Sequence, residues 1–376
     1  MTIKKRSLCS SLAAALVSAA AVATPPPTPF AGVTLAGGDF APDKLPGVHG
    51  TNYHYPAEAE LRWAASEGFT VVRVPFRWER LQPAAFGPLH PPDLKLLDAT
   101  VAHAKRHGLK VIFDAHNYGR YYPDGGPAEA GPTGRVGVEV PVEAFADFWG
   151  RVAERYREED HLIFALMNEP HDQPLEAWVE ALNAAIAAIR DAGAPQKVLV
   201  SGTGWSGANN WFRFRKDPYE RANAQAILDV RDPADRWAVE VHQYLDFDGG
   251  GNDRRFPQTV DAGLSHLIPL TAWLKEHGIS AVLGEFAVPA ASCGDGPDQL
   301  GDEAIAAMLD HLHEHADVWD GWVWWAAGAW WLDDYDFDLT PDKPAGAGEV
   351  AQMPVLRRYM PVRPAVVPRT DPEPAE

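Results

Sequence analysis

Eight short apolar runs recur along the 376-residue chain, and they constrain its fold more than any other feature. The runs are rich in Val, Ile, Leu and Phe, and breakers bound them, which is typical of strands buried on both faces. They cover residues 30–35, 71–76, 110–115, 162–167, 197–201, 237–244, 280–285 and 321–325. Strands of this kind belong to parallel sheets whose two faces are both covered.

Amphipathic helical patterns separate these runs. The pattern at 92–107 places Leu94 and Leu97 on one face, begins at a proline and stops before Gly108. Further helical patterns cover residues 145–156, 175–189, 260–277 and 299–315. Alternating strands and helices imply parallel βαβ units, and eight of them predict an α/β fold, a single-domain (β/α)8 TIM barrel over residues 30–360. A doubly wound open sheet is the alternative, but no Gly-rich phosphate-binding turn follows the first run.

The two ends of the chain lack this alternation. A basic segment at 4–6, an Ala-rich apolar stretch too short for a stable membrane span, and small residues at 21 and 23 fit a cleavable export signal. We therefore expect residues 1–23 to be a signal peptide, followed by a Pro-rich spacer at 24–29, and the protein to be secreted or periplasmic. Residues 361–376 are Pro-rich, and we expect a loose C-terminal tail.

Charge and composition narrow the classes of partner. The formal net charge of −19 disfavours nucleic acid and anionic membrane surfaces, which need clustered Lys and Arg, and suits a neutral substrate. The 14 Trp suit a carbohydrate cleft, because indole faces stack on sugar rings, although most of them should fill the core. Cys9 leaves with the signal and Cys293 stays alone, so no intramolecular disulfide is expected. We expect a monomer without membrane contact after signal cleavage.

Two strings end the fourth and seventh runs with a glutamate: Leu166-Met167-Asn168-Glu169-Pro170 and Val282-Leu283-Gly284-Glu285-Phe286. A carboxylate at the tip of a doubly buried strand is poorly solvated and needs partners or a function. Either string alone has a simple structural explanation, such as one half of an ion pair. On one barrel, however, the two carboxylates would face each other across its mouth. Glycoside hydrolysis needs that arrangement, with one carboxyl group protonating the leaving oxygen and the other attacking or activating water.

The other predicted strands also end in polar and aromatic residues, and barrel enzymes build their sites from these C-terminal ends. The set is Arg73, Arg77 and Trp78; Asp114, His116, Asn117 and Tyr118; Asn168 and Glu169; Gly202 to Trp205; His242 and Tyr244; Glu285; and Trp324 and Trp325. Each residue alone is a weak signal, but turns at random strand ends would not gather this combination.

With these motifs the chain resembles glycoside hydrolase family 5, and most of all its cellulase (endo-β-1,4-glucanase) branch. The motifs are Val-Arg73-Val-Pro, Asp-Ala-His116-Asn-Tyr, Asn168-Glu169-Pro, Val-His242-Gln-Tyr244, Gly-Glu285-Phe, Trp-Trp325-Ala-Ala-Gly and Ser-Gly-Thr-Gly-Trp205. The resemblance covers about residues 30–360. The opening Phe30-Ala-Gly-Val-Thr-Leu-Ala-Gly also looks like that branch. Two departures concern substrate preference: Thr34 stands where this opening motif would have Asn, and the Gly-rich loop 246–253 is specific to this chain.

The resemblance implies a role for each matching residue. Glu169 would be the general acid and later the base, and Glu285 the nucleophile that forms a glycosyl-enzyme intermediate. Asn168 would bond the sugar 2-hydroxyl.

The resemblance also implies supporting roles around the glutamates. Tyr244 would donate to Glu285, and Arg73 would keep Glu285 ionised by charge. His116 and His242 would hold sugar hydroxyls and tune Glu169. Trp325 would form the floor under the reacting sugar, and Trp205 is a candidate platform. Independently of the resemblance, side chains alternate along a strand, so one of Trp324 and Trp325 should point into the barrel and the other out.

The function that follows is an exported, retaining endo-acting β-1,4-glucanase of cellulose-type β-glucans. A related β-glycanase on the same barrel (β-mannanase, xylanase or mixed-linkage glucanase) remains open, as does a catalytically silent carbohydrate-binding barrel, which would not need two facing carboxylates. No cofactor or metal is expected. His311 and His315 share one face of a predicted helix, which we interpret as a solvated helix end and not as a metal site. The loop that begins at Asp246 resembles the start of a calcium loop, but its twelfth position, where a calcium loop has an acidic residue, is Pro257.

Overall fold

The computed structural model describes residues 29–123, 133–213, 221–246, 249–251, 257–294, 299–332, 335–340 and 350–361. The predicted signal peptide, the spacer before Pro29 and the tail after Pro361 lie outside these residues, as do residues 247, 248, 252 and 253 of the Gly-rich loop.

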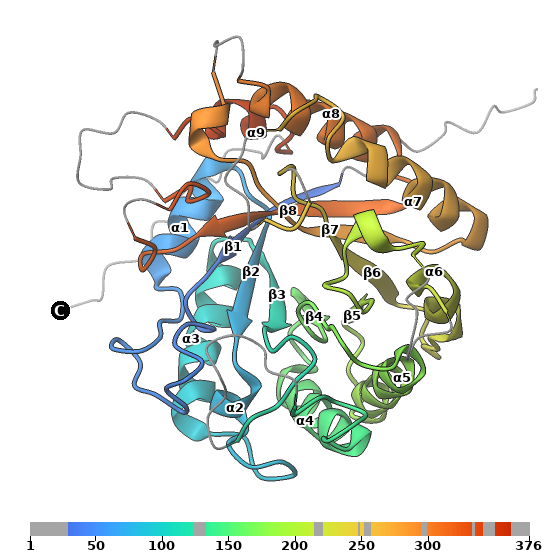
Figure 1. Ribbon diagram of the computed structural model, residues 1–376. Helices are drawn as coiled ribbons and strands as arrows, with labels where there is room; N and C mark the ends of the chain where they lie inside the picture. Colours follow the sequence, from blue (N-terminus) through green and yellow to red (C-terminus); the bar gives the residue numbers. More distant parts are fainter. Residues whose placement is uncertain are drawn as a thin grey trace, which may run out of the picture.

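Eight parallel strands close into a barrel in sequential order, with β1 pairing with β8 (Figure 1). The strands are β1 (Phe30–Leu35), β2 (Val71–Phe76), β3 (Lys110–Ala115), β4 (Leu162–Ala165), β5 (Lys197–Ser201), β6 (Trp237–His242), β7 (Ala281–Phe286) and β8 (Trp319–Ala327). This confirms the (β/α)8 prediction and excludes the open sheet. Strands β1, β2, β3 and β5 have the predicted bounds, whereas β4 and β6 stop two residues earlier and β8 extends two residues further at each end.

Helices surround the barrel (Figure 1). They are α1 (Glu58–Glu67), α2 (Trp78–Leu81), α3 (Pro91–Arg106), α4 (Val142–Tyr156), α5 (Leu175–Asp191), α6 (Asn223–Ala226), α7 (Leu264–His277), α8 (Gly301–Glu314) and α9 (Met353–Arg357). The short α2 and α6 and the helix α1 did not stand out in the sequence, since α1 buries only Leu61 and Ala64. None of the helices in the described part of the chain combines the length and apolar character needed to span a bilayer.

The barrel walls separate two apolar cores. The outer core lies between strands and helices and takes most of the large aromatics, including Trp149, Trp178 and Trp324. The inner core is small and takes one or two side chains from each strand from β2 to β8: Val71, Ile112, Ile163, Ala165, Leu199, Ala238, Val282 and Val323. The partly buried Phe30 of β1 packs against them. Because side chains alternate along a strand, the next inward positions are two residues further on, toward the C-terminal ends. Those positions carry Arg73, Asp114 and Glu240.

Candidate active site

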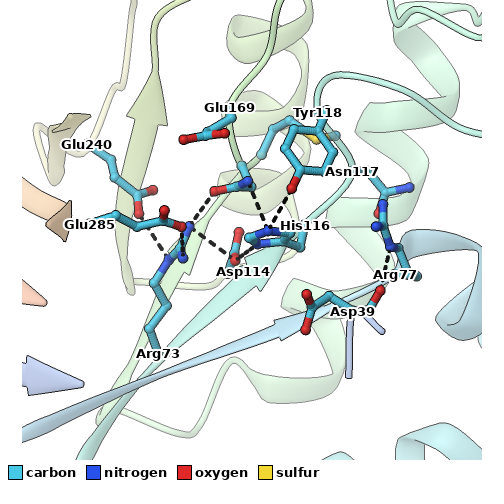
Figure 2. Close-up of polar contacts among 12 residues, drawn as sticks. Asp39, Arg73, Arg77, Asp114, His116, Asn117, Tyr118, Glu169, Glu240 and Glu285 are labelled. Atoms are coloured by element: carbon cyan, nitrogen blue, oxygen red, sulfur yellow. Dashed lines mark hydrogen bonds and ion pairs between the residues drawn. The ribbon is translucent and has the colours of Figure 1, made fainter. Parts of the chain in front are cut away.

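Arg73 is the centre of the polar layer above the inner core. It is fully buried on β2, and its guanidinium contacts four acceptors from different strands (Figure 2). Nη1 donates to Glu285 Oε1 at 2.6 Å and Nη2 to Asn168 Oδ1 at 2.7 Å. Asp114 Oδ2 lies 3.1 Å from Nη2, and Glu240 Oε1 lies 3.2 Å from Nε. One buried cation thus fixes the positions of three carboxylates and one amide.

Glu285 is the second-last residue of β7, and both oxygens of its carboxylate are bound. Arg73 binds Oε1, and Tyr244 donates its hydroxyl hydrogen to Oε2 at 2.7 Å. Burial alone would raise the pKa of this carboxyl, but the charges of His242 and Arg73 and the Tyr244 hydrogen bond outweigh it. The pKa of Glu285 therefore lies below its usual value, so the group stays ionised.

Glu169 has the opposite environment. It follows β4 in a left-handed backbone conformation, with φ 45°, which turns its side chain toward the barrel mouth, where it is 17% exposed. Burial raises the pKa of this carboxyl and the charge of Glu285 adds to the rise, while the hydrogen bond and charge of His242 oppose it. Two neighbouring carboxyl groups with pKa values shifted apart are the arrangement that assigns one acid and one anion.

His242 lies between the two glutamates. Its Nδ1 is 2.7 Å from Glu169 Oε1 and 3.4 Å from Glu285 Oε2. Burial lowers the pKa of the His242 ring. The charge of Glu285 and the contacts with Glu169 and Glu240 raise this pKa by more than burial lowers it, so that the pKa lies at about 10. The imidazolium contributes positive charge between the carboxylates.

A chain of hydrogen bonds positions Asn168. Asp114 Oδ2 is 2.7 Å from His116 Nδ1, and His116 Nε2 is 3.1 Å from Asn168 Nδ2. The tautomer with its hydrogen on Nδ1 satisfies both contacts, because Nε2 then accepts from the amide. The amide has a second hydrogen that can donate to a substrate hydroxyl.

Two neighbouring tryptophans near the C-terminal end of β8 point to opposite sides of the barrel wall, as alternation predicts. Trp324 is buried in the outer core and donates to the Phe337 carbonyl. Trp325 faces the site, stacks on His116 with ring centroids 5.4 Å apart and an angle of 17°, and donates from Nε1 to the Tyr335 hydroxyl at 2.8 Å. Its ring is therefore fixed beside the Asn168 hydrogen-bond chain.

Trp205 lies at the rim and is 46% exposed. Its ring stacks on His171 at 4.7 Å with an angle of 16°, and it belongs to a left-handed turn from Gly204 to Ser206. A rigidly backed, exposed indole can support a ligand ring, and the backbone N–H of Trp205 donates to the carbonyl of Pro170, directly after Glu169, at 3.0 Å.

The glutamates and His242 can also be considered as a metal site, since one ligand atom from each lies within 4.8 Å of the others. These atoms are already engaged: Glu169 Oε1 with His242, and the Glu285 oxygens with Arg73 and Tyr244. Buried cations and hydrogen-bond donors already compensate the carboxylates, so the cluster is better explained as a proton-handling site.

Sequence reasoning missed Glu240, which is fully buried on β6 beside Arg73. Ala238, Glu240 and His242 are two residues apart along β6, so all three lie on the inner face of the barrel. This spacing could have predicted Glu240 as a residue of the site. Sequence reasoning also gave no role in the site to Thr34. This side chain is buried, and its hydroxyl has no hydrogen-bond partner among the described residues. In the Gly-rich loop, Asp246 accepts from the Gly251 N–H at 3.1 Å.

Comparison with known proteins agrees with this geometry. The cellulase family, described as glycosyl hydrolase family 5, matches residues 33–328. Endo-beta-1,4-glucanase B of Emericella nidulans is 33% identical over 333 residues, 88% of this chain and 91% of that protein. The structure of XacCel5A in complex with cellopentaose superposes with a TM-score of 0.79 at 36% identity, over 88% of this chain and 99% of that one. An endo-beta-1,4-glucanase of Xanthomonas axonopodis pv. citri gives a TM-score of 0.78 at 36% identity, over 89% and 100%.

The family match covers most of the barrel and includes every strand-end residue assembled around Arg73. The relatives are matched over nearly their whole length, which confirms the resemblance found in the motifs. The chain therefore belongs to the cellulase family, glycosyl hydrolase family 5, and is a glycoside hydrolase.

Proposed function

We propose that this enzyme cleaves internal β-1,4-glucosidic bonds of cellulose-type β-glucans with retention of anomeric configuration. The observation that carries the proposal is the pair Glu169 and Glu285, with oxygens within 4.8 Å of each other and pKa values shifted in opposite directions. Retaining enzymes place their two carboxyl groups about 5 Å apart, whereas inverting enzymes need room for a water between them.

The reaction follows a double displacement. Ionised Glu285 attacks the anomeric carbon while protonated Glu169 gives its proton to the leaving glycosidic oxygen, which forms a glycosyl-enzyme ester. Ionised Glu169 then takes a proton from water, which attacks the anomeric carbon and releases Glu285. Tyr244 and Arg73 aim Glu285, and the site needs no cofactor for either step.

The remaining site residues hold the sugar. Asn168 donates to the 2-hydroxyl, a contact that strengthens as the oxocarbenium ion forms, and His116 orients this amide. His242 tunes Glu169. Trp325 supports the sugar at the cleavage point, and Trp205 supports another sugar farther along the glucan.

The substrate assignment is supported by the names of the relatives, which are endo-β-1,4-glucanases, and by the cellopentaose bound to XacCel5A. A β-mannanase, xylanase or mixed-linkage glucanase would use the same glutamates, because specificity resides in the loops. A silent binding barrel would have no need of the opposed pKa shifts. We further propose an exported monomer with residues 1–23 removed as a signal, residues 24–29 as a spacer, a catalytic domain at 30–360 and a loose tail at 361–376.

Product analysis on a panel of soluble polysaccharides tests the assignment. Carboxymethylcellulose should lose viscosity much faster than it gains reducing ends, and mannan and xylan should yield little product. Glu285→Gln should lose at least about a thousandfold in kcat while remaining folded, because no intermediate can form. Preferential release of mannose or xylose oligomers would replace the glucanase assignment with a sister activity.

A further inference from the structure

Glu240 is a third buried glutamate in the site, and its carboxylate lies between two cationic groups. Oε1 is 3.2 Å from Arg73 Nε and 3.9 Å from His242 Nε2, and Figure 2 shows it beside Glu285. Neither oxygen of Glu240, nor His242 Nε2, makes a hydrogen bond of good geometry with any described residue. The group is therefore held by charge, with its whole side chain removed from solvent.

Strand β7 has a glycine, Gly284, at the point where the Glu240 carboxylate packs against it. A Cβ atom at Gly284 would lie 2.4 Å from Glu240 Oε1 and 2.5 Å from its Cγ, far inside van der Waals contact. The glycine is thus required by the close approach of Glu240, directly before Glu285 in the chain. A side chain at 284 and the Glu240 carboxylate cannot occupy the same space.

The two ring nitrogens of His242 each face a carboxyl group. Nδ1 meets Glu169 Oε1 at 2.7 Å, and Nε2 points toward Glu240. A neutral imidazole carries one hydrogen, so one nitrogen would direct a lone pair at an oxygen; a doubly protonated ring offers a hydrogen to each side. The titratable and charged groups that surround the ring and Glu240 are Arg73 on β2, Asp114 on β3, His116 directly after β3, Tyr118, Glu169, Tyr244 and Glu285.

We propose that Glu240 is a positioning residue that keeps His242 doubly protonated, so that Nδ1 always donates to Glu169. With Oε1 of Glu169 accepting, the acidic hydrogen of that carboxyl group must be on Oε2, where it can reach the glycosidic oxygen. The placement of the acidic hydrogen on Glu169 Oε2 rests on the proposed function, whereas the protonation state of His242 is independent of it. The raised pKa of His242 agrees with it.

Nitrogen-15 NMR of histidine-labelled enzyme tests the proposal directly. The His242 signals are identified by their loss in His242→Asn. In the wild type both ring nitrogens should remain protonated up to about pH 9, well above the usual titration of histidine. In Glu240→Gln the ring should become neutral near neutral pH, while Glu240→Asp, which keeps the charge, should retain the doubly protonated form.

Glu79→Gln is a matched control, because Glu79 is also a buried glutamate but is bound by Asn117 and the Tyr122 N–H. It can lower the melting temperature but should leave the His242 signals unchanged. A neutral His242 in the wild type at neutral pH, or an identical titration in Glu240→Gln, overturns the proposal.

The activity readout is the pH dependence of kcat/KM on a soluble β-glucan. At the pH of the acid limb His242 is protonated in both enzymes, so removing the negative charge of Glu240 lets Glu285 release its proton more readily. The acid limb in Glu240→Gln should therefore move to lower pH by about one unit or more. An unchanged acid limb contradicts the proposal. If the enzyme fails on every β-glucan, the proposed function fails, and the NMR result still decides the role of Glu240.

Discussion

The Tyr244 hydroxyl offers the sharpest test of how Glu285 is kept ionised. Tyr244→Phe removes one donor, 2.7 Å from Glu285 Oε2, without removing the ring or the Arg73 contact. A hydrogen bond to a charged group is worth about 1.5–3 kcal/mol, which corresponds to about 1–2 pKa units. Because the lost bond stabilised the charged form, the pKa of Glu285 should rise and the acid limb of kcat/KM should move to higher pH by that amount.

The assay is kcat/KM on a soluble β-1,4-glucan across the acid range, at constant ionic strength. The matched control is Tyr156→Phe, which loses a 2.9 Å bond to the Asp98 carboxylate on the outside of the barrel. The control should lower the melting temperature and leave the acid limb in place. If Tyr244→Phe lowers activity equally at every pH, Tyr244 does not act on the ionisation of Glu285 and this reasoning is refuted.

Three further predictions concern acid catalysis, sugar stacking and stability. Glu169→Ala should lose far less activity on a dinitrophenyl cellobioside, whose leaving group needs no protonation, than on glucan; equal losses would remove the acid assignment. Trp325→Ala should lower kcat about tenfold, as the loss of one ring contact to a flattening sugar predicts, whereas Trp205→Ala should mainly raise KM; wild-type kinetics in both would reduce these rings to packing. The third prediction concerns Asp232, whose carboxylate lies 2.8 Å from the Arg190 guanidinium and accepts from the Ala234 and Arg236 N–H groups. These contacts outweigh the effect of burial and lower the pKa of Asp232 to about 2. Its stabilisation is complete above the ordinary aspartate pKa and is lost as pH falls toward 2, so Asp232→Asn should cost about 2 kcal/mol in urea unfolding at neutral pH, with the difference disappearing in acid.

The barrel was predictable because apolar periodicity is a local property. Strands buried on both faces read as continuous runs, and four of them begin and end where the runs do. The errors fall at strand ends: β4 and β6 stop two residues earlier than predicted, and a left-handed residue, Glu169, follows β4. Local strain of this kind is imposed by the surrounding site and leaves no periodic signal.

The site was predictable as a set of residues, but its internal contacts were not. Alternation along β8 correctly separated Trp325 from Trp324. The position of Glu240 next to Arg73 and His242 depends on the space left by Gly284 on another strand, which no local pattern reveals. Likewise, the His171 ring that backs Trp205 comes from a separate loop, so the platform required the three-dimensional structure.

The central claim is that Glu169 and Glu285 act together in a double displacement. Proton NMR of a soluble cello-oligosaccharide during the first turnovers measures the anomeric configuration of the newly formed reducing end before mutarotation. The account predicts that the β-anomer appears first and the α-anomer grows in later. Initial release of the α-anomer would mean inversion, and would contradict both the nucleophilic role of Glu285 and the meaning assigned here to the short distance between the two carboxylates.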